Sequence, residues 1–177
     1  MEKSVITLSD LILENSGGEL DLLLRSFLCE KNPSIESFLH NKAILQEDQD
    51  GARTTLIFDD ISNDIIGYYT IKLQTFNFTN ASGKQRKSLA GSKEANSFLA
   101  ILIAKLGRAD KYKGIVKGSE ILAYALSSCD EIKRLTAEKV VCVEFVDEPT
   151  LLKFYTDNQF IPLQRNENNL NIHFRKI

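Results

Sequence analysis

Tryptophan is absent from the 177-residue sequence, and proline, cysteine and histidine are scarce, with three, three and two residues. The cysteines, at positions 29, 129 and 142, have no CxxC spacing and no histidine at zinc-site distance, which argues against a disulfide framework or a structural zinc site. No apolar run approaches the roughly 20 residues of a membrane span. The first residues lack the pattern of a secretory leader. Together with the lack of a Pro- or Gly-rich linker, these absences predict a single cytoplasmic domain over residues 1–177, without metal or membrane contact.

Charge is distributed unevenly along the chain. The net charge of −2 and the pI of about 5.8 argue against a general nucleic-acid binder, because such domains are usually basic. The window of residues 84–117 nevertheless has a net charge of +7, so the remainder carries −9. The basic residues of this window are Lys84, Arg86, Lys87, Lys93, Lys105, Arg108, Lys111, Lys113 and Lys117. This asymmetry predicts a basic site for an anionic ligand on an otherwise acidic protein.

Hydrophobic patterns and turn residues predict a mixed α/β fold. Strands are expected at residues 5–8, 53–58, 65–73, 98–104, 140–146, 159–163 and 170–174. One helix is expected over the apolar residues 11–13 and 20–27, and a second helix begins at residue 33 and ends before Gly51. Two more helices are expected at residues 119–128 and 151–157. Asn32 is the expected cap of the second of these helices, with Pro33 at its first position. Residues 77–96 are rich in polar residues and are predicted to form a long loop.

A buried-type strand, a glycine-containing turn and a helix follow one another between residues 98 and 128. Backbone N–H groups converge at a helix N-terminus, where the dipole adds about half a positive charge. Glycine allows a positive φ and a close approach of the backbone to a ligand. Lys113 and Lys117 add formal charge at the same turn. The pattern favours phosphate binding, although many strand-to-helix turns contain glycine without binding a phosphate.

The sequence around this turn, residues 101–126, resembles the strand, pyrophosphate loop and helix of the GNAT superfamily of N-acetyltransferases. Residues 152–160, LKFYTDNQF, resemble the later Phe-Tyr-x-x-x-Gly-Phe segment of that family. Segments similar to its N-terminal helix and hairpin are residues 34–39, 53–57 and 66–70. The segments follow the family order over about residues 20–163. The N-terminal half resembles the subgroup that includes bacterial toxins, which acetylate aminoacyl-tRNA.

The resemblance implies a GNAT-like mixed β-sheet, splayed at its centre and flanked by helices, with acetyl-CoA between the two central parallel strands. The backbone of Leu106, Gly107 and Arg108 would hold the thioester carbonyl and pantetheine. The loop that would hold the pyrophosphate consists of Lys113, Gly114, Ile115, Val116, Lys117, Gly118 and Ser119. Tyr155 falls where the family places a tyrosine beside the CoA sulfur. Its phenol would protonate the leaving thiolate; the alternative is a half-buried helix aromatic without a chemical role.

The sequence departs from the family pattern at three positions. Lys113 stands where Arg or Gln is usual. Val116 stands where the first glycine of a Gly-x-Gly pair is usual, and a β-branched residue resists positive φ and would project its Cβ toward the phosphates. Gln159 replaces the glycine before Phe160. Asn158 is therefore expected to supply the left-handed residue that ends the preceding helix.

Glu144 is the second candidate catalytic residue. It lies within an apolar strand, where an ionised carboxylate is costly unless it is paired. It is interpreted either as the general base for the attacking amine or as the structural partner of a lysine. Asp147 and Glu148, at the end of the strand, are alternative bases that would act through water.

The residues and the resemblance together predict an N-acetyltransferase that uses acetyl-CoA as cosubstrate and acetylates a primary amine by direct attack. The acceptor is expected to be a small-molecule or protein amine. A tRNA acceptor is less favoured, because phosphate contacts dominate such affinity and the net charge is negative. A degenerate GNAT fold that acts as a binding module is the alternative that Val116 motivates. An antitoxin and a second copy of the chain are further partners consistent with the toxin-like resemblance.

Overall fold

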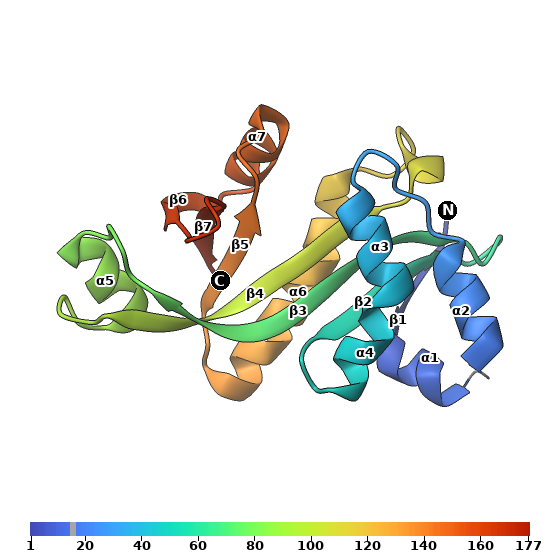
Figure 1. Cartoon of the computed structure of the whole chain (residues 1–177), viewed down its shortest axis with the longest axis horizontal. Coiled ribbons are helices and arrows are strands. Elements are labelled where there is room, and N and C mark those ends of the chain that lie inside the picture. Colours follow the sequence, from blue (N-terminus) through green and yellow to red (C-terminus); the bar gives the residue numbers. More distant parts are fainter. Residues whose placement is uncertain (15–16) are drawn as a thin grey trace. The chain divides into compact units, whose positions relative to one another are not determined.

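The computed structural model describes residues 1–14 and 17–177. In this part of the chain seven strands form one mixed sheet, in the order β1-β2-β3-β4-β5-β7-β6, flanked by helices (Figure 1). The strands are β1 (Lys3–Thr7), β2 (Arg53–Asp59), β3 (Ile65–Asn77), β4 (Ser97–Arg108), β5 (Val140–Phe145), β6 (Ile161–Arg165) and β7 (Asn171–Lys176). The helices are α1 (Leu8–Glu14), α2 (Gly17–Arg25), α3 (Pro33–Asn41), α4 (Ala43–Asp48), α5 (Gly83–Ala90), the 3-10 helix η1 (Asp110–Tyr112), α6 (Gly118–Thr136) and α7 (Pro149–Asp157). None of the helices described is long and apolar enough to cross a membrane.

The chain forms two compact units. The first unit consists of residues Met1–Lys72 and Lys105–Ala125, and the second of Leu73–Ala104 and Leu126–Ile177. Strands β3 and β4 and helix α6 contribute residues to both units. A single domain over the whole chain stays a prediction.

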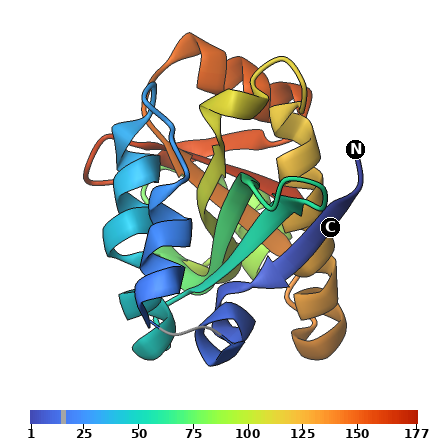
Figure 2. The same cartoon turned by 90° about the vertical axis from the view of Figure 1, so that its right-hand side faces the viewer.

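The first unit is built on antiparallel pairing of β2 with β1 and with the beginning of β3. Helices α2 and α3 lie side by side next to these strands (Figure 2). Gly107, near the end of β4, is buried beneath this helical layer. A Cβ atom at Gly107 would lie only 2.4 Å from Cγ2 of Ile35 and 3.1 Å from the ring of Tyr68. The absence of a side chain at this position therefore lets helix α3 approach the strand closely.

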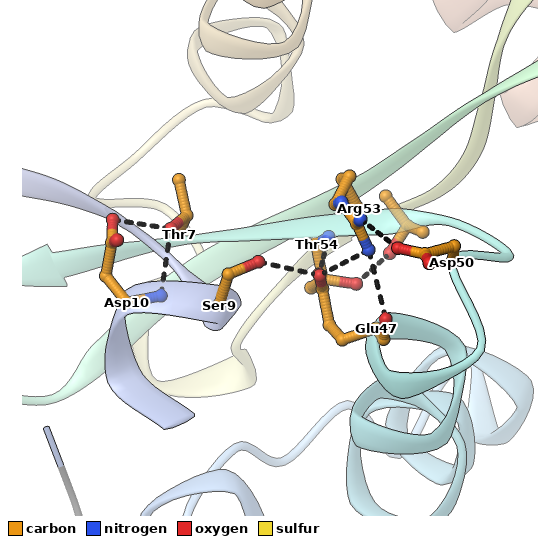
Figure 3. Close-up of polar contacts among 8 residues, drawn as sticks. Thr7, Ser9, Asp10, Glu47, Asp50, Arg53 and Thr54 are labelled. Atoms are coloured by element: carbon orange, nitrogen blue, oxygen red, sulfur yellow. Dashed lines mark hydrogen bonds and ion pairs between the residues drawn. The ribbon is translucent and has the colours of Figure 1, made fainter. Parts of the chain in front are cut away.

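A buried carboxylate joins α4 to β2 in the first unit (Figure 3). Oε1 of Glu47 accepts a hydrogen bond from the Thr54 N–H at 2.5 Å. Its other oxygen accepts from the Ser9 hydroxyl at 2.8 Å and from the Arg53 guanidinium at 3.2 Å. A buried charge is tolerated when it is paired and hydrogen-bonded in this way. Glu47 is thus a structural group that fixes the start of the hairpin.

The second unit contains the parallel pairing of β4 with β5, which covers only Ile101–Ile103 and Val141–Val143. Strand β7 then pairs antiparallel with β5 and with β6. An apolar cluster lies on the face of β5 that presents Val140 and Cys142. The other buried members of the cluster are Phe76, Phe78, Ala81, Leu89, Phe98, Ala100, Leu102, Ile172 and Phe174. The predicted mixed α/β sheet is therefore confirmed.

The predicted long loop at residues 77–96 is wrong in part, because these residues contain helix α5. Ser82 caps the helix: its side chain accepts from the N–H of Gln85, and the Gln85 side chain accepts from the Ser82 N–H. Gly91 ends the helix in the left-handed conformation, with a φ of 82°. Leu89 packs in the apolar cluster. The capping box and the closing glycine stabilise a short helix whose single apolar contact gives little periodicity.

The single helix expected from residue 33 to before Gly51 is in fact two helices, α3 and α4, which meet at Lys42. The break changes the phase of the apolar stripe, so Leu45 is 51% exposed while Leu39 is buried. Pro33 opens α3 as predicted, but Asn32 makes no side-chain capping bond to the helix. Its Oδ1 accepts instead from the hydroxyl of Ser34 at 2.8 Å. The predicted N-cap position of Asn32 is therefore confirmed, but its side chain does not cap the helix.

Candidate functional site

The residues expected to bind acetyl-CoA and those expected to catalyse transfer lie in different units. Leu106, Gly107 and Arg108 and the whole loop from Lys113 to Ser119 belong to the first unit. Tyr155 and Glu144 belong to the second. The structure thus provides a loop in one unit and two candidate catalytic side chains in the other.

Gly114 shapes the loop between η1 and α6. It has a φ of 82°, so it supplies the left-handed residue that the turn requires. Val116 is not among the residues with positive φ, and its side chain is 2% exposed. The neighbouring Ile115 is the exposed one, at 66%. The expectation that Val116 projects toward the phosphates is therefore wrong: the turn falls two residues earlier, and the valine packs into the core.

The backbone N–H groups of the loop are not all free for a ligand. Four of them donate within the loop: Lys113 to the Asp110 carbonyl at 3.0 Å, Ile115 and Val116 to the Tyr112 carbonyl at 3.1 and 3.0 Å, and Lys117 to Oε1 of Glu120 at 2.8 Å. Among the described residues, the N–H groups of Gly114, Gly118 and Ser119 have no such partner. The N–H groups that could bind a phosphate directly are thus fewer than the seven expected.

Two side chains hold the loop in place. Nη1 of Arg108 donates to the Val116 carbonyl at 2.7 Å, while its Nε is buried without a partner among the described residues. Glu120 reaches back from the first turn of α6, and its Oε2 forms an ion pair with Lys3 at 2.8 Å. The Lys3 ammonium lowers the pKa of the Glu120 carboxyl, with help from the Lys117 N–H. Arg108 is therefore a positioning residue for the loop, and Glu120 is an internal cap of α6.

A cavity of about 390 Å³ lies beside the loop within the first unit. Its walls carry three basic and three acidic side chains, namely Lys31, Lys111, Lys113, Glu30, Asp64 and Asp110. Lys111 pairs with Asp64, and Asp110 accepts from the Glu30 N–H at 2.8 Å. Lys31 lies close enough to Lys113 to lower the pKa of the Lys113 ammonium. Two ammonium groups that repel each other favour an anion placed between them.

Tyr155 is fixed by the way helix α7 ends. The N–H of Phe160 donates to the Tyr155 carbonyl, and the N–H of Gln159 donates to the Thr156 carbonyl, both at 3.0 Å. These two bonds form a Schellman motif, in which the left-handed residue is Gln159 with a φ of 69°. Asn158 has a φ of −94°, so its predicted left-handed role is wrong. The motif seats the Phe160 ring 5.6 Å from the Tyr155 ring.

The Tyr155 side chain is 8% exposed and packs 4.7 Å from the ring of Phe145. Burial raises the pKa of its phenol to about 12, so the hydroxyl keeps its proton at neutral pH. No other residue in the described part of the chain hydrogen-bonds to this hydroxyl. The phenol is therefore fixed by packing, protonated, and without a hydrogen-bond partner in the described part of the chain. These are the properties expected of a proton donor to a ligand.

Glu144 lines a second cavity, of about 360 Å³, within the second unit. Its Oε1 accepts from the Asn166 side chain at 2.9 Å. It is not paired with a lysine in the residues described, which removes the structural role considered from the sequence. Asp147 instead pairs with Arg165 at 2.5 Å, and this guanidinium lowers the pKa of the Asp147 carboxyl.

Sequence reasoning missed Lys31 and Asn166, and it did not foresee the capping role of Glu120. The spacing of Lys117 and Glu120 matches a helix start with an acidic third residue, so that signal was present. Lys31 and Asn166 are far along the chain from the groups they approach, and only the tertiary structure brings them there. The two histidines are structural: His40 contacts the Phe27 carbonyl at 2.8 Å, and His173 is buried against Phe145.

No family model matches the chain, and no curated protein matches it in sequence. Solved structures do match it. They include AtaT complexed with acetyl-methionyl-tRNAfMet, with a TM-score of 0.76, 19% identity and coverage of 99% of this chain and 95% of that one. The chain has the fold of these toxins. A tyrosine-to-phenylalanine variant of KacT gives a TM-score of 0.77 with 17% identity, covering 99% of this chain and 95% of that one.

A variant of the AtaT toxin bound to the C-terminus of the antitoxin AtaR and to acetyl-CoA is also similar, with a TM-score of 0.74 and 18% identity. It covers 99% of this chain and 94% of that one. The fold expected from the resemblance is therefore confirmed. The similarity to AtaT and KacT extends over the first unit and the second.

Proposed function

We propose that this protein is an N-acetyltransferase that uses acetyl-CoA to acetylate a primary amine. The observation that carries the proposal is the loop between η1 and α6, where Gly114 makes the turn and Lys113 presents its ammonium group next to that of Lys31, from the segment between α2 and α3. The N–H groups of Gly118 and Ser119 open α6 beside them. These groups suit the phosphates of CoA, and the fold is shared with AtaT, which has been solved with acetyl-CoA.

Tyr155 is assigned the role of general acid. When the amine nitrogen bonds to the thioester carbonyl carbon, the C–S bond breaks and leaves a thiolate. The Tyr155 phenol, with its pKa raised to about 12 by burial, is protonated and able to donate its proton to that sulfur. The attacking nitrogen loses its own proton to water. AtaT and KacT have both been solved as tyrosine-to-phenylalanine variants, which supports a tyrosine as the residue to test.

An aminoacyl-tRNA is the second candidate acceptor. AtaT has been solved with acetyl-methionyl-tRNAfMet, and helix α5 and the segment after it present the exposed side chains of Lys84, Lys87 and Lys93. Exposed lysines on one element are suited to contact an RNA backbone. Arg86 is not available in the same way, because it donates to the carbonyls of Ala81 and Ala95. An antitoxin partner is proposed on the same grounds, since AtaT binds the C-terminus of AtaR.

The decisive experiment is a thermal shift with acetyl-CoA. A ligand present at 100 times its Kd stabilises the folded state by about 2.7 kcal/mol, which is readily measured. Acetyl transfer is then measured with aminoacyl-tRNA and with free amines. No shift at millimolar acetyl-CoA would overturn the enzyme proposal and leave the binding-module alternative. A shift without transfer to any amine would have the same consequence for catalysis.

A further inference from the structure

The cavity that contains Glu144 has a distinctive wall. It is an open pocket within the second unit, lined by the end of β3 with the residues after it, by β5, and by the turn between β6 and β7. Its lining residues are Gln74, Thr75, Phe76, Asn77, Thr79, Glu144, Gln164, Asn166, Glu167, Asn168 and Ile172. Glu144 and Glu167 are the charged residues in this set, and neither a lysine nor an arginine is among them. The wall therefore offers hydrogen-bond acceptors and negative charge.

Hydrogen bonds hold the walls together. The Gln164 amide donates to the Asn77 carbonyl at 2.7 Å and accepts from the Thr79 N–H at 2.9 Å, which joins the β6–β7 hairpin to the segment after β3. Oδ1 of Asn166 accepts from the N–H groups of Asn168 and Leu170 at 3.0 and 2.9 Å. Asn166 is thereby fixed with its amide NH₂ on Glu144. The acceptors around the cavity are preorganised rather than free to rotate.

The nearest basic side chain on the hairpin is directed elsewhere. Arg165 contacts Asp147 at 2.5 Å and the Asn169 side chain at 3.0 Å, and it does not line the cavity. Within the described part of the chain, the second carboxylate oxygen of Glu144 has no hydrogen-bond partner. That oxygen is a carboxylate acceptor available to a ligand in the wall.

One part of the wall is apolar. Phe76 and Ile172 belong to both the cavity lining and the apolar cluster of the second unit. A ligand that matches both surfaces carries a cationic group for Glu144 and a hydrocarbon stem for Phe76 and Ile172. A volume of about 360 Å³ is sufficient for such a chain. A phosphate or carboxylate would meet only negative charge there.

We infer that this cavity binds a primary alkylammonium group, of the kind carried by a lysine side chain or an alkyl diamine. Oε2 of Glu144 would accept from the ammonium, and Phe76 and Ile172 would contact its stem. The binding of an alkylammonium group is inferred from the geometry of the cavity alone. The role of the cavity in selecting the acetyl acceptor rests on the proposed function. In that role the cavity favours acceptors that carry a cationic alkyl chain over acceptors that carry a neutral one.

The test measures binding of 1,5-diaminopentane and of 1,5-pentanediol by NMR titration of the full-length protein without acetyl-CoA. The two probes have the same stem length and differ in charge. The diamine is expected to bind at least tenfold more tightly than the diol, with shifts at Glu144 and Asn166. Equal binding of the two probes would overturn the inference.

Two variants and a control locate the site. Glu144→Gln, which keeps the shape of the side chain, is expected to weaken diamine binding at least tenfold. Thr75→Lys places a cation on an exposed position of the wall and is expected to have the same effect while Glu144 remains. Glu131→Gln changes an exposed carboxylate of α6 outside the cavity and should leave binding unchanged. Unchanged binding in both cavity variants would place the diamine elsewhere and refute the proposal.

The cavity and the enzyme proposal fail separately. If the diamine binds as expected but acetyl-CoA gives no thermal shift, the cavity inference holds and the proposed function is wrong. If acetyl-CoA binds and transfer proceeds equally to lysine amide and norleucine amide, the proposed function holds and the cavity does not select the acceptor.

Discussion

The loop of the first unit and the cavity of the second unit present opposite chemistry. Beside the loop, Lys31 from the segment between α2 and α3 lies near Lys113, Lys111 pairs with Asp64, and the acidic Glu120 is paired with Lys3 and the Lys117 N–H. In the cavity, Glu144 and Glu167 have no basic neighbour in the wall. The two reactants of an acetyl transfer from CoA to an amine differ in the same sense, since CoA is anionic and the amine is a cation before it loses its proton. Under the proposed function the first unit would take the anionic reactant and the second the cationic one, a division that the net charge of −2 conceals.

The largest effect is expected for Tyr155→Phe. Loss of the phenol proton removes the general acid, and groups in that role contribute roughly 10² to 10⁴ in rate. We expect kcat to fall about a hundredfold or more while the Kd for acetyl-CoA stays within about twofold, as measured by stopped-time acetylation assays and calorimetry. Wild-type turnover in the variant would show that Tyr155 is not the general acid. The second unit would then no longer be assigned the proton transfer to the thiolate.

The next largest effect is on stability. Gly107→Ala places a Cβ 2.4 Å from Ile35 Cγ2, and overpacking of a core typically costs about 1–3 kcal/mol. We expect the free energy of unfolding in urea to fall by that amount. Gly83→Ala is the matched control in the second unit, because a Cβ there meets Lys93 at an ordinary 3.7 Å. Equal stability of the two variants would show that the close packing of α3 on β4 is not required.

A smaller effect is expected for Lys113→Ala. Removing one exposed ammonium costs roughly 1 kcal/mol, so the Kd for acetyl-CoA should rise about fivefold. The effect should shrink at high salt, because exposed charges are screened. Lys153→Ala, which removes an exposed lysine of α7, is the control. If both variants bind acetyl-CoA like the wild type, the loop does not provide the charge that binds the cofactor. The first unit is then not the anion-binding member of the comparison.

The smallest effect is expected for Gln159→Gly. Gln159 adopts a φ of 69°. The left-handed conformation destabilises a residue with a Cβ by about 1 kcal/mol or slightly more, and glycine removes this strain. Glycine also increases the conformational entropy of the unfolded chain, which offsets part of the gain. The variant should therefore gain up to about 1 kcal/mol of unfolding free energy. A decrease would indicate that the Gln159 side chain makes a stabilising contribution that outweighs its backbone strain.

Most of the fold could be predicted from the sequence because its strands are apolar or alternating and its helices carry start signals. Pro33 and the hairpin at residues 53–73 are examples, and both were predicted correctly. Helix α5 was not, because its stability comes from end caps and one buried leucine rather than from an apolar stripe. The break at Lys42 was missed because two short amphipathic helices in succession resemble one long helix in a periodicity pattern.

The elements that form the candidate site could be predicted from the sequence, but the backbone conformation of single residues in them could not. The strand, turn and helix around Gly114 were correctly located, since glycine and lysine content mark such a turn. The residue that takes the left-handed conformation at the end of α7 was not, since it is Gln159 rather than Asn158, and the burial of the Val116 side chain was also missed. Backbone conformation at these positions is decided by hydrogen bonds to residues several positions away, which composition does not reveal.

The burial of Cys29, Cys129 and Cys142 makes this chain convenient for site-selective labelling. Burial raises the pKa of all three thiols, that of Cys129 to about 12, so they are poor nucleophiles toward a maleimide dye in the folded state. A thiol introduced at the exposed position 115 would therefore react almost alone. A fluorophore there would sit at the tip of the loop proposed to bind CoA and would report ligand arrival in real time, without a radioactive or coupled assay.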